Sequence, residues 1–445
     1  MILLAALACT GPTEPVVERT PPEGDAALVF DHPPRNLLVI SIDTTRKDHI
    51  DRWAPDGLER TPFLSALMAS GVVLDDHLQC SNWTFASTSC THRGQLMEET
   101  GFYPKLSNAT RAPLPEHQGT LATRLGRMDF HSGLVSSNDW LSDNWNNVEG
   151  IDEFHRRLTG NTGALLDDGI GLLREWRDRG DERRWFLQVH LVEPHPPYTP
   201  PDAYDPTEDV AGWDLDSQAG QYDVTRQWPQ MTEAEQQQLV EVLDARYSGE
   251  LQYMDAQLAQ RWQVLQDEGF LDDTLVVFWN DHGEQFFEHG QQAHAYGLNA
   301  EEGDAFMAFV GAGLQPMAWT APTHAVDFVP TVLQALGADP EQEAGLMGYV
   351  LGTSPAGRPR YAATDARLGP QVSVVDGDWK MVFDMDDGTV GMWNRRDDPK
   401  ELRDRFEAHD EKAQELWELL RPRARLLEPL VPEVVVRWPK GLDSR

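Results

Sequence analysis

Two potential metal ligands, Asp281 and His282, directly follow a short apolar segment. This segment, 274–279, is rich in β-branched and aromatic residues, which is typical of a buried strand in a parallel sheet. In open α/β sheets, ligands bind just beyond the carboxyl ends of the strands. A carboxylate and an imidazole at such a place would suit a divalent cation. The same residues would also suit a helix N-cap, with Asp281 as the cap and Glu284 three residues later.

A second apolar segment, 36–42, also ends in an acid, Asp43. Its composition predicts a strand that is buried on both faces. Parallel strands bring their carboxyl ends to the same edge of a sheet, so Asp43 would lie near Asp281 and His282. The two strand ends, far apart in the chain, therefore predict a shared site.

An uncharged, hydroxyl-rich segment, 80–90, lies between these two strands and predicts the start of a helix. Ser87, Thr88 and Ser89 would serve there as capping residues. Thr84 differs from them because of the sequence motifs that accompany it.

Together, these segments resemble the sulfatase branch of the alkaline-phosphatase superfamily. Residues 83–87 resemble the family's nucleophile segment, with Thr84 at the nucleophile position, and residues 190–198 resemble its His-containing loop. Residues 281–284 and His294 complete the set. The likeness extends from about residue 35 to about residue 385, and the motifs follow the family's order, so jointly they are specific.

The nucleophile position departs from that of sulfatases proper, which convert a Cys or Ser into formylglycine. The Pro and Arg of the formylglycine context are replaced here by Ala86 and Thr88. Neither Cys80 nor Cys90 is followed by an Arg at the required spacing. We therefore expect no formylglycine. A Thr at this position resembles the phosphoryl-handling members, such as lipoteichoic-acid synthases and phosphoethanolamine transferases.

The resemblance implies a metal-activated nucleophile. Asp43, Asp281 and His282 would hold one divalent metal ion (Ca, Mg, Mn or Zn), with the Thr84 oxygen as a further ligand. Thr44 follows Asp43 where many sulfatases carry a second acid, which favours one metal over two. Metal binding lowers the pKa of a hydroxyl, so Thr84 could attack a sulfate or phosphate ester. Water or an acceptor alcohol would then release the group from Thr84.

Two histidines in polar loops are candidates for the leaving-group side of the site. His195 and His294 would protonate the leaving group or contact substrate oxygens. The alternative is that they are ordinary surface residues, since the chain has 14 histidines. Glu284, Glu288 and His289 would either approach the metal or belong to a solvated loop.

Structural roles are expected for several other residues near these motifs. Arg46, Asp48 and His49 match the family's turn after the first strand and predict a hydrogen-bond network. Asp255 lies within a predicted helix and would hold a neighbouring element. The pair 92–93, His and Arg, is interpreted as an insertion next to the site that could contact an anion.

The composition limits the classes of partner. With 73 acidic and 37 basic residues, the net charge of −36 opposes binding to nucleic acid or to an anionic membrane surface. An anionic ester substrate would then require local positive charge from the metal and nearby His or Arg. We expect a hydrolase that cleaves sulfate or phosphate esters, with phosphate or phosphonate esters favoured. The alternatives are a phosphoryl-group transferase acting on lipid or glycan head groups, or a catalytically silent binding relative.

The first residues are apolar, too few to span a bilayer, and lead to Cys9. They resemble a bacterial lipoprotein signal, in which Cys9 would carry the lipid, although the basic region that usually precedes it is missing. Residues 1–34 would form this signal and a tether, with membrane contact only through Cys9 and a periplasmic or cell-surface location. In an oxidising compartment Cys80 and Cys90 could form a disulfide, and two buried free thiols are the alternative.

The overall pattern predicts an α/β fold of the alkaline-phosphatase and sulfatase type, with a mainly parallel central sheet flanked by helices. Residues 35–354 would form the catalytic domain, and residues 355–445 a small C-terminal α+β subdomain and tail. A long helix is expected to start at Thr232, with Glu235 completing a capping box and a stripe of apolar residues facing the core.

The remaining elements are predicted from local composition. In the C-terminal part we expect short strands at 371–375 and 379–383 and a helix at 410–420. Lys380, on the second of these strands, is expected to be structural. Residues 213–229 form a polar segment, interpreted as a loop, that could build a wall of the substrate site.

Overall fold

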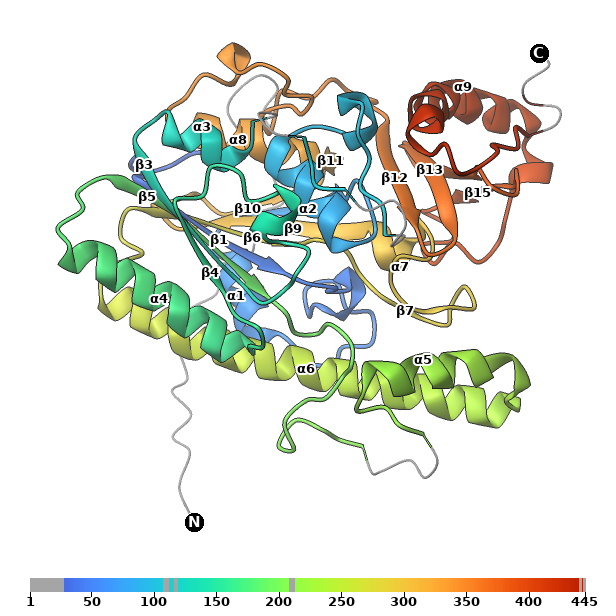
Figure 1. Cartoon of the computed structure of the whole chain (residues 1–445), viewed down its shortest axis with the longest axis horizontal. Helices are drawn as coiled ribbons and strands as arrows, with labels where there is room; N and C mark the ends of the chain where they lie inside the picture. Colours follow the sequence, from blue (N-terminus) through green and yellow to red (C-terminus); the bar gives the residue numbers. More distant parts are fainter. Residues whose placement is uncertain (1–27, 107–111, 116–118, 208–212, 440–441, 443–445) are drawn as a thin grey trace.

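The centre of the molecule is a nine-stranded sheet. The structure, a computed structural model, describes residues 28–106, 112–115, 119–207, 213–439 and 442. Strand β1 (Asn36–Ile42) lies between β5 (Arg184–Leu191) and β6 (Thr274–Asn280). Beyond β5 follow β3 (Phe130–Ser136) and β4 (Glu153–Arg156), and beyond β6 follow β9 (Asp304–Val310), β2 (Val72–Leu78), β10 (Met317–Trp319) and β11 (Thr323–His324) (Figure 1).

The strands of this sheet are mainly parallel, as the sequence predicts. β1 pairs in parallel with both β5 and β6, while β9 runs antiparallel to its neighbours β6 and β2. Every residue of β6 is buried, and β1 is buried except at its first residue. In the register of the β1–β6 pair, Ile42 lies opposite Asn280. The residues that follow these two strands are therefore delivered to the same edge of the sheet.

Helices cover both faces of the sheet (Figure 1). One face is covered by α1 (Pro62–Ala69), α4 (Thr162–Asp178) and α6 (Glu233–Asp267), whose apolar residues share one core with the strands. The other face is covered by α3 (Leu121–Gly126) and α8 (Phe328–Ala335), which share a second core with the sheet. Helix α2 (Thr84–Arg93) lies on this second side, next to α8. Shorter elements are α5 (Gln218–Gln227), α7 (Ala300–Gly303), β7 (Gln285–Phe286) and β8 (Gln292–Ala293).

The long helix α6 confirms the expected start and packing. The Thr232 side chain accepts from the backbone of Glu235, and the Glu235 carboxylate accepts from the Thr232 backbone. Its apolar stripe is fully buried in the core between the sheet and α4. Asp255 on this helix accepts from the backbone N–H groups of Phe63 and Leu64, at 2.9 and 2.7 Å. The expectation that Asp255 holds a neighbouring element is confirmed, because these groups belong to the first turn of α1.

The C-terminal part contains a separate antiparallel sheet of four strands, in the order β12-β13-β14-β15. These are β12 (Arg360–Ala366), β13 (Gly369–Asp376), β14 (Trp379–Asp384) and β15 (Val390–Asn394). The helix α9 (Asp410–Leu427) packs against β13 and β14 and continues beyond the predicted end through Pro422. Lys380 forms a buried ion pair with Glu401 at 2.8 Å, which confirms its structural role.

No helix within the described ranges is both long enough and apolar enough to cross a membrane. Cys9, the predicted lipid attachment site, and most of the predicted tether lie outside the described residues.

Candidate active site

The ends of β1 and β6 bring three potential metal ligands together. Asp43 follows β1, and Asp281 and His282 follow β6. One ligand atom from each of them lies within 4.8 Å of the other two. Nε2 of His282 is 3.6 Å from Oδ1 of Asp43 and 3.6 Å from Oδ2 of Asp281. All three side chains have an exposed fraction of 0%. The helix-cap alternative for Asp281 is wrong, because Asp281 follows a strand and no helix begins there.

The carboxylates of Asp43 and Asp281 lie close together, and their hydrogen-bond partners satisfy them only in part. Within the described part of the chain, Oδ1 of Asp43 and Oδ2 of Asp281 have no hydrogen-bond partner. Burial, followed by the charge of Asp43, raises the pKa of Asp281 well above its usual value. Two buried carboxylates at this distance can both be ionised only if a cation compensates them. The donor set of two carboxylates and one imidazole therefore fits a divalent cation.

Two further contacts fix the carboxylates in place. Thr44 has a left-handed backbone, with φ at 50°, and its N–H donates to Oδ1 of Asp281 at 3.1 Å. Nε2 of His190, on β5, lies 3.3 Å from Oδ2 of Asp43. Burial opposes the ionisation of Asp43, but the hydrogen bond from His190 and the nearby imidazoles hold the pKa of this carboxyl below its usual range. His190 was missed from the sequence because it lies inside a strand, where a histidine is usually structural.

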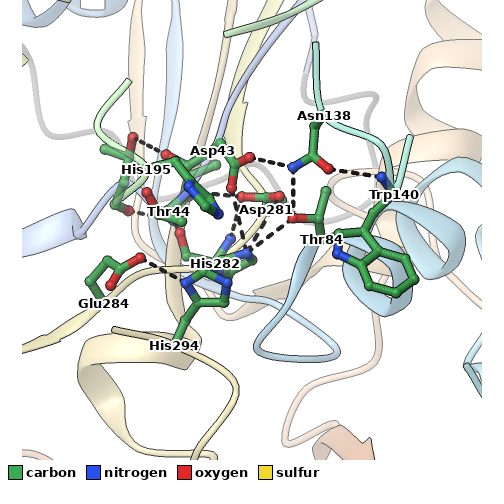
Figure 2. Close-up of polar contacts among 12 residues, drawn as sticks. Asp43, Thr44, Thr84, Asn138, Trp140, His195, Asp281, His282, Glu284 and His294 are labelled. Atoms are coloured by element: carbon green, nitrogen blue, oxygen red, sulfur yellow. Dashed lines mark hydrogen bonds and ion pairs between the residues drawn. The ribbon is translucent and has the colours of Figure 1, made fainter. Parts of the chain in front are cut away.

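Thr84 lies beside the predicted ligands. It is the first residue of α2, and its Oγ1 is 3.5 Å from Nε2 of His282. Its side chain is nearly buried, with an exposed fraction of 2%, yet it lines a cavity of about 290 Å³ that also borders Asp43. Figure 2 shows the Thr84 hydroxyl in direct contact with the His282 ring. The structure thus brings the predicted nucleophile and the three predicted ligands into one group.

Cys80 and Cys90 form a disulfide that encloses Thr84 in the sequence. The bridge joins the segment before α2 to the body of that helix. The sequence left open a disulfide or two buried free thiols, and the structure shows the disulfide. Ser89 and Thr88 are not caps as expected, because their hydroxyls donate to the carbonyls of Phe85 and Thr84 within the helix.

Asn138, which the sequence analysis did not single out, connects two of these groups. Its Nδ2 donates to Oδ2 of Asp43 at 2.6 Å and to Oγ1 of Thr84 at 3.2 Å. Its Oδ1 accepts from the backbone N–H of Trp140 at 2.9 Å, which fixes the orientation of the amide (Figure 2). Asn138 follows β3 at the same edge of the sheet. A polar residue just beyond a strand end, the pattern that indicates Asp43 and Asp281, therefore also indicates Asn138.

His195 and His294 also line the cavity. Nδ1 of His195 hydrogen-bonds to the carbonyl of Pro196 at 2.7 Å, and Nδ1 of His294 to Oε1 of Glu284 at 2.7 Å. Their ring centres lie 5.3 Å apart, and the His294 ring lies 4.4 Å from that of His282. Burial lowers the pKa of His294 well below its usual value. In both histidines the Nδ1 position is engaged, which leaves Nε2 available to the cavity.

Glu284 differs from both roles that the sequence left open. It is completely buried, so it does not belong to a solvated loop. Its two oxygens hydrogen-bond to His294 and, at 2.9 Å, to the hydroxyl of Tyr198, rather than joining the metal ligands. Burial raises the pKa of Glu284 well above its usual value. Glu284 therefore positions the His294 ring.

The turn after β1 forms the expected hydrogen-bond network. Arg46 donates to both oxygens of Asp48 and to Glu288, at 2.6 Å for the latter. His49 hydrogen-bonds to Asp48 and to Asp244 on α6. Glu288 therefore serves this network, and the prediction of a structural role for the turn is confirmed.

The interpretation of residues 92–93 as an anion contact is wrong. Arg93 is completely buried, 3.6 Å from Glu149, and donates to the carbonyl of Asn146. His92 borders a different, very small cavity. Both residues lie in the last turn of α2, and the cavity borders its first residue instead.

The predicted polar loop 213–229 contains a helix, α5, so its interpretation as a loop is wrong in part. Three α5 residues line the cavity, Gln218, Gln221 and Tyr222. Arg367, in the turn between β12 and β13, lines it from the C-terminal sheet. The cavity is therefore enclosed by the central sheet edge, by α5 and by the C-terminal sheet.

The sequence matches known proteins over most of its length. A family model described as Sulfatase matches residues 35–338. The choline-sulfatase of Rhizobium meliloti (strain 1021) is 26% identical over 339 residues, which cover 64% of this chain and 62% of that protein. The multifunctional alkaline phosphatase superfamily protein PehA of Trinickia caryophylli is 25% identical over 351 residues, which cover 66% of each. The chain thus spans a little under two thirds of the length of these curated relatives.

Solved structures with the same fold include proteins with different named ligands and activities. One, solved in complex with its substrate D-glucosamine-2-N,6-O-disulfate, superimposes with a TM-score of 0.71 at 16% identity, covering 90% of this chain and 99% of that one. Another, a phosphonate monoester hydrolase from Silicibacter pomeroyi, superimposes with a TM-score of 0.68 at 19% identity, covering 89% and 96%. At this level of identity the likeness establishes the fold. The family match over residues 35–338 shows that the chain belongs to the sulfatase family of the alkaline-phosphatase superfamily.

Proposed function

We propose that this protein is a metal-dependent hydrolase that cleaves sulfate or phosphate esters through Thr84, with phosphate or phosphonate esters favoured. One observation carries the proposal. The Thr84 hydroxyl lies at the cavity, 3.5 Å from His282, beside two buried carboxylate oxygens that have no partner among the described residues. Metal coordination is one of the ways in which a threonine hydroxyl is activated as a nucleophile, and a hydroxyl beside a candidate cation site has that arrangement.

Asp43, Asp281 and His282 would hold one divalent cation. When bound, it would lower the pKa of the Thr84 hydroxyl and offset the negative charge on the ester oxygens. The chain's own contribution to the nucleophile is Asn138, whose Nδ2 donates to Oγ1 of Thr84. This hydrogen bond would stabilise the negative charge on Oγ1, because a donor with a fixed orientation needs no rearrangement.

In the first step, Oγ1 of Thr84, whose proton would already have been released to solvent, would bond to the phosphorus or sulfur atom, and the bond to the leaving oxygen would break. The leaving oxygen would take a proton from His195 or His294. The partners of their Nδ1 atoms, Pro196 O and Glu284, ensure that a proton gained by either ring is held on Nε2, at the cavity. An anionic substrate would favour the protonated form of His294, whose pKa is otherwise lowered by burial.

In the second step, water would attack the same phosphorus or sulfur atom, and the bond to Oγ1 would break, which returns Thr84 to the deprotonated form that starts the next turnover. The histidine that gave its proton would take one from the water. The Thr84 side chain has no second hydroxyl that could expel the bound phosphoryl or sulfuryl group. Release of this group therefore requires attack by water. An alcohol could replace water in this attack, as in a transferase. The preference for phosphate or phosphonate over sulfate rests on Thr84 itself, because a Thr at this position resembles the phosphoryl-handling members of the family.

The test is a set of parallel assays on an aryl sulfate, an aryl phosphate monoester and an aryl phosphonate monoester, with Mg²⁺, Mn²⁺, Ca²⁺ and Zn²⁺. Thr84→Ala should abolish turnover, and Thr84→Ser, which keeps a hydroxyl, should retain part of it. Intact-protein mass spectrometry after a rapid acid quench should find one substrate-derived group on the wild-type chain and none on Thr84→Ala. Adding glycerol as an acceptor would distinguish transfer from hydrolysis.

Calorimetric titration with the same metal ions gives a readout that does not depend on turnover. Thr84→Ala should still bind the metal, whereas Asp281→Ala should not. Metal binding without turnover of any ester would indicate the silent relative. Full activity of Thr84→Ala would disprove the mechanism.

A further inference from the structure

Arg367 is placed at the cavity by the C-terminal sheet. It lies in the turn between β12 and β13, and its backbone N–H donates to the carbonyl of Ala295 at 2.9 Å, next to His294 in the chain. Its side chain lines the cavity together with Tyr222 of α5. The β12–β13 turn and α5, which are far apart in the sequence, therefore meet at the Arg367 side chain.

The guanidinium group of Arg367 is held by aromatic side chains instead of by an acid. Nη2 donates to the hydroxyl of Tyr222 at 2.7 Å. The group lies 5.1 Å from the ring centre of Tyr222 and 5.2 Å from that of Tyr296. Within the described ranges no carboxylate lies within ion-pair distance of it, although the chain has 73 acidic residues against 37 basic ones. A guanidinium has five N–H donors, so most of them remain available to a ligand.

The position of Arg367 separates it from the reacting group. Asp43, Asp281 and His282 have exposed fractions of 0%, and Thr84 of 2%, so the transferred group would bind at the bottom of the cavity. Arg367 is an exposed residue and stands at the opening. His195 and His294, the proposed proton donors to the leaving oxygen, are half-buried and line the same cavity, and the Ala295 carbonyl that accepts from Arg367 directly follows His294 in the chain. Whatever Arg367 contacts would therefore belong to the leaving-group part of the substrate.

We propose that Arg367 binds a second anionic group, carried by the leaving-group part of the substrate. The proposal rests on the proposed function and narrows its substrate class to esters that bear another carboxylate, sulfate or phosphate beyond the scissile group. A planar guanidinium binds such a group through two parallel hydrogen bonds. Its tyrosine contacts keep the group in place without neutralising it, so an anion from the substrate meets a free charge. This would also offset the repulsion of an anionic ligand by a chain of net charge −36.

The test compares two aryl esters of the class that the protein cleaves, one with a neutral nitrophenyl leaving group and one with a carboxylate added to the ring. The wild type should prefer the carboxylated ester. Arg367→Gln should lower kcat/KM for the carboxylated ester by about tenfold or more and leave the neutral ester within about twofold, as expected for loss of one charge-assisted contact. Arg367→Lys should restore part of the preference, because it keeps the charge and loses the two-point geometry.

The matched control is Arg226→Gln, on α5 close to Tyr222. Arg226 is paired with Asp223, and its exposed fraction is 75%, so its removal changes the same net charge without touching the cavity. It should leave the preference unchanged. The preference should also weaken at high salt in the wild type and not in Arg367→Gln.

Equal losses on both esters in Arg367→Gln would overturn the proposal and assign Arg367 to the packing of α5 on the C-terminal sheet. An equal loss of the preference for the carboxylated ester in Arg367→Gln and Arg226→Gln would overturn the proposal as well. The absence of turnover on every ester in the wild type would instead count against the proposed function. In that case calorimetric binding of benzoate and isophthalate to the metal-loaded protein would still test Arg367. The proposal would be supported if isophthalate bound more tightly than benzoate to the wild type but not to Arg367→Gln. It would be refuted if the wild type and Arg367→Gln bound isophthalate equally tightly.

Discussion

Asn138 joins the strand-end carboxylates to the proposed nucleophile. One amide nitrogen contacts both Asp43 and Thr84, and the amide oxygen is engaged by the Trp140 backbone. An amide with its oxygen fixed in this way presents only donors to the site. It can therefore stabilise negative charge on the carboxylate and on the attacking oxygen at the same time.

Replacing Asn138 by Ala should lower kcat by about a hundredfold, the usual effect of removing one fixed donor from a developing negative charge. Asn138→Asp should be at least as inactive, because a third carboxylate would lie beside Asp43 and repel the anionic ester. Steady-state kinetics with a saturating metal concentration would measure both. An unchanged kcat in Asn138→Ala, with an unchanged melting temperature, would remove Asn138 from the catalytic group.

At the scale of single elements, helix α2 is tied to the segment before it by the Cys80–Cys90 disulfide. Replacing both cysteines by Ala should lower the free energy of unfolding by roughly 2 to 3 kcal/mol, as expected for a loop of this length. Activity should fall as well, because Thr84 lies within the closed loop. Urea denaturation of the oxidised wild type, the reduced wild type and the double variant would measure the effect. Equal stability of all three would contradict it.

Helix α1 is docked on α6 by a carboxyl group that titrates in an accessible range. Burial raises the pKa of Asp255 to about 6 from its ordinary value of 3.8. Because the folded pKa is the higher one, the folded state binds the extra proton, and this contribution to stability is complete below about pH 4. It is lost as the pH rises through about 6, by at most roughly 3 kcal/mol for a shift of this size.

The free energy of unfolding of the wild type, minus that of Asp255→Asn, should therefore decrease between pH 4 and pH 7. Taking the difference between the two proteins removes the titration of the many other acids. Urea denaturation at several pH values would give it. A difference that rises with pH would show that the two backbone N–H donors outweigh burial and keep Asp255 ionised.

At the scale of the whole molecule, the C-terminal sheet and the central domain share a core. The N–H of Ala363 on β12 donates to the carbonyl of Cys80 at 3.0 Å, and Arg395 pairs with Asp304 of β9 at 2.6 Å. Residues of α2 pack in the same apolar cluster as those of β13, β14 and α9. The subdomain therefore supports the helix that carries Thr84.

We expect the two sheets to unfold together, in one calorimetric transition whose midpoint rises when a divalent cation is added. A chain ending at residue 354 should be insoluble or aggregated, because it would leave the apolar cluster around Cys90 uncovered. Two well-separated transitions in the full chain, or a soluble and active truncated chain, would show that the C-terminal sheet is an independent domain.

The sequence identified the site residues where a local pattern carried enough information. An apolar run that ends in an acid indicates a strand end, which selected Asp43 and Asp281, and the family motifs selected Thr84, His195 and His294. The same information was insufficient for residues 92–93, since nothing local distinguishes an arginine that is buried against Glu149 from one that faces a substrate.

What the sequence determined by itself was the mainly parallel sheet, the long α6 helix and the delivery of ligands to one sheet edge. These features follow from hydrophobic periodicity and capping, which act between neighbours in the chain. Only the tertiary structure decided which side chains complete the site. Asn138 contacts Thr84, 54 residues away in the sequence. Glu284 contacts His294, 10 residues away, and Arg367 contacts Tyr222, 145 residues away. A strand-end pattern could have pointed to Asn138, but the contacts of all three side chains depend on how the elements pack, which no local pattern specifies.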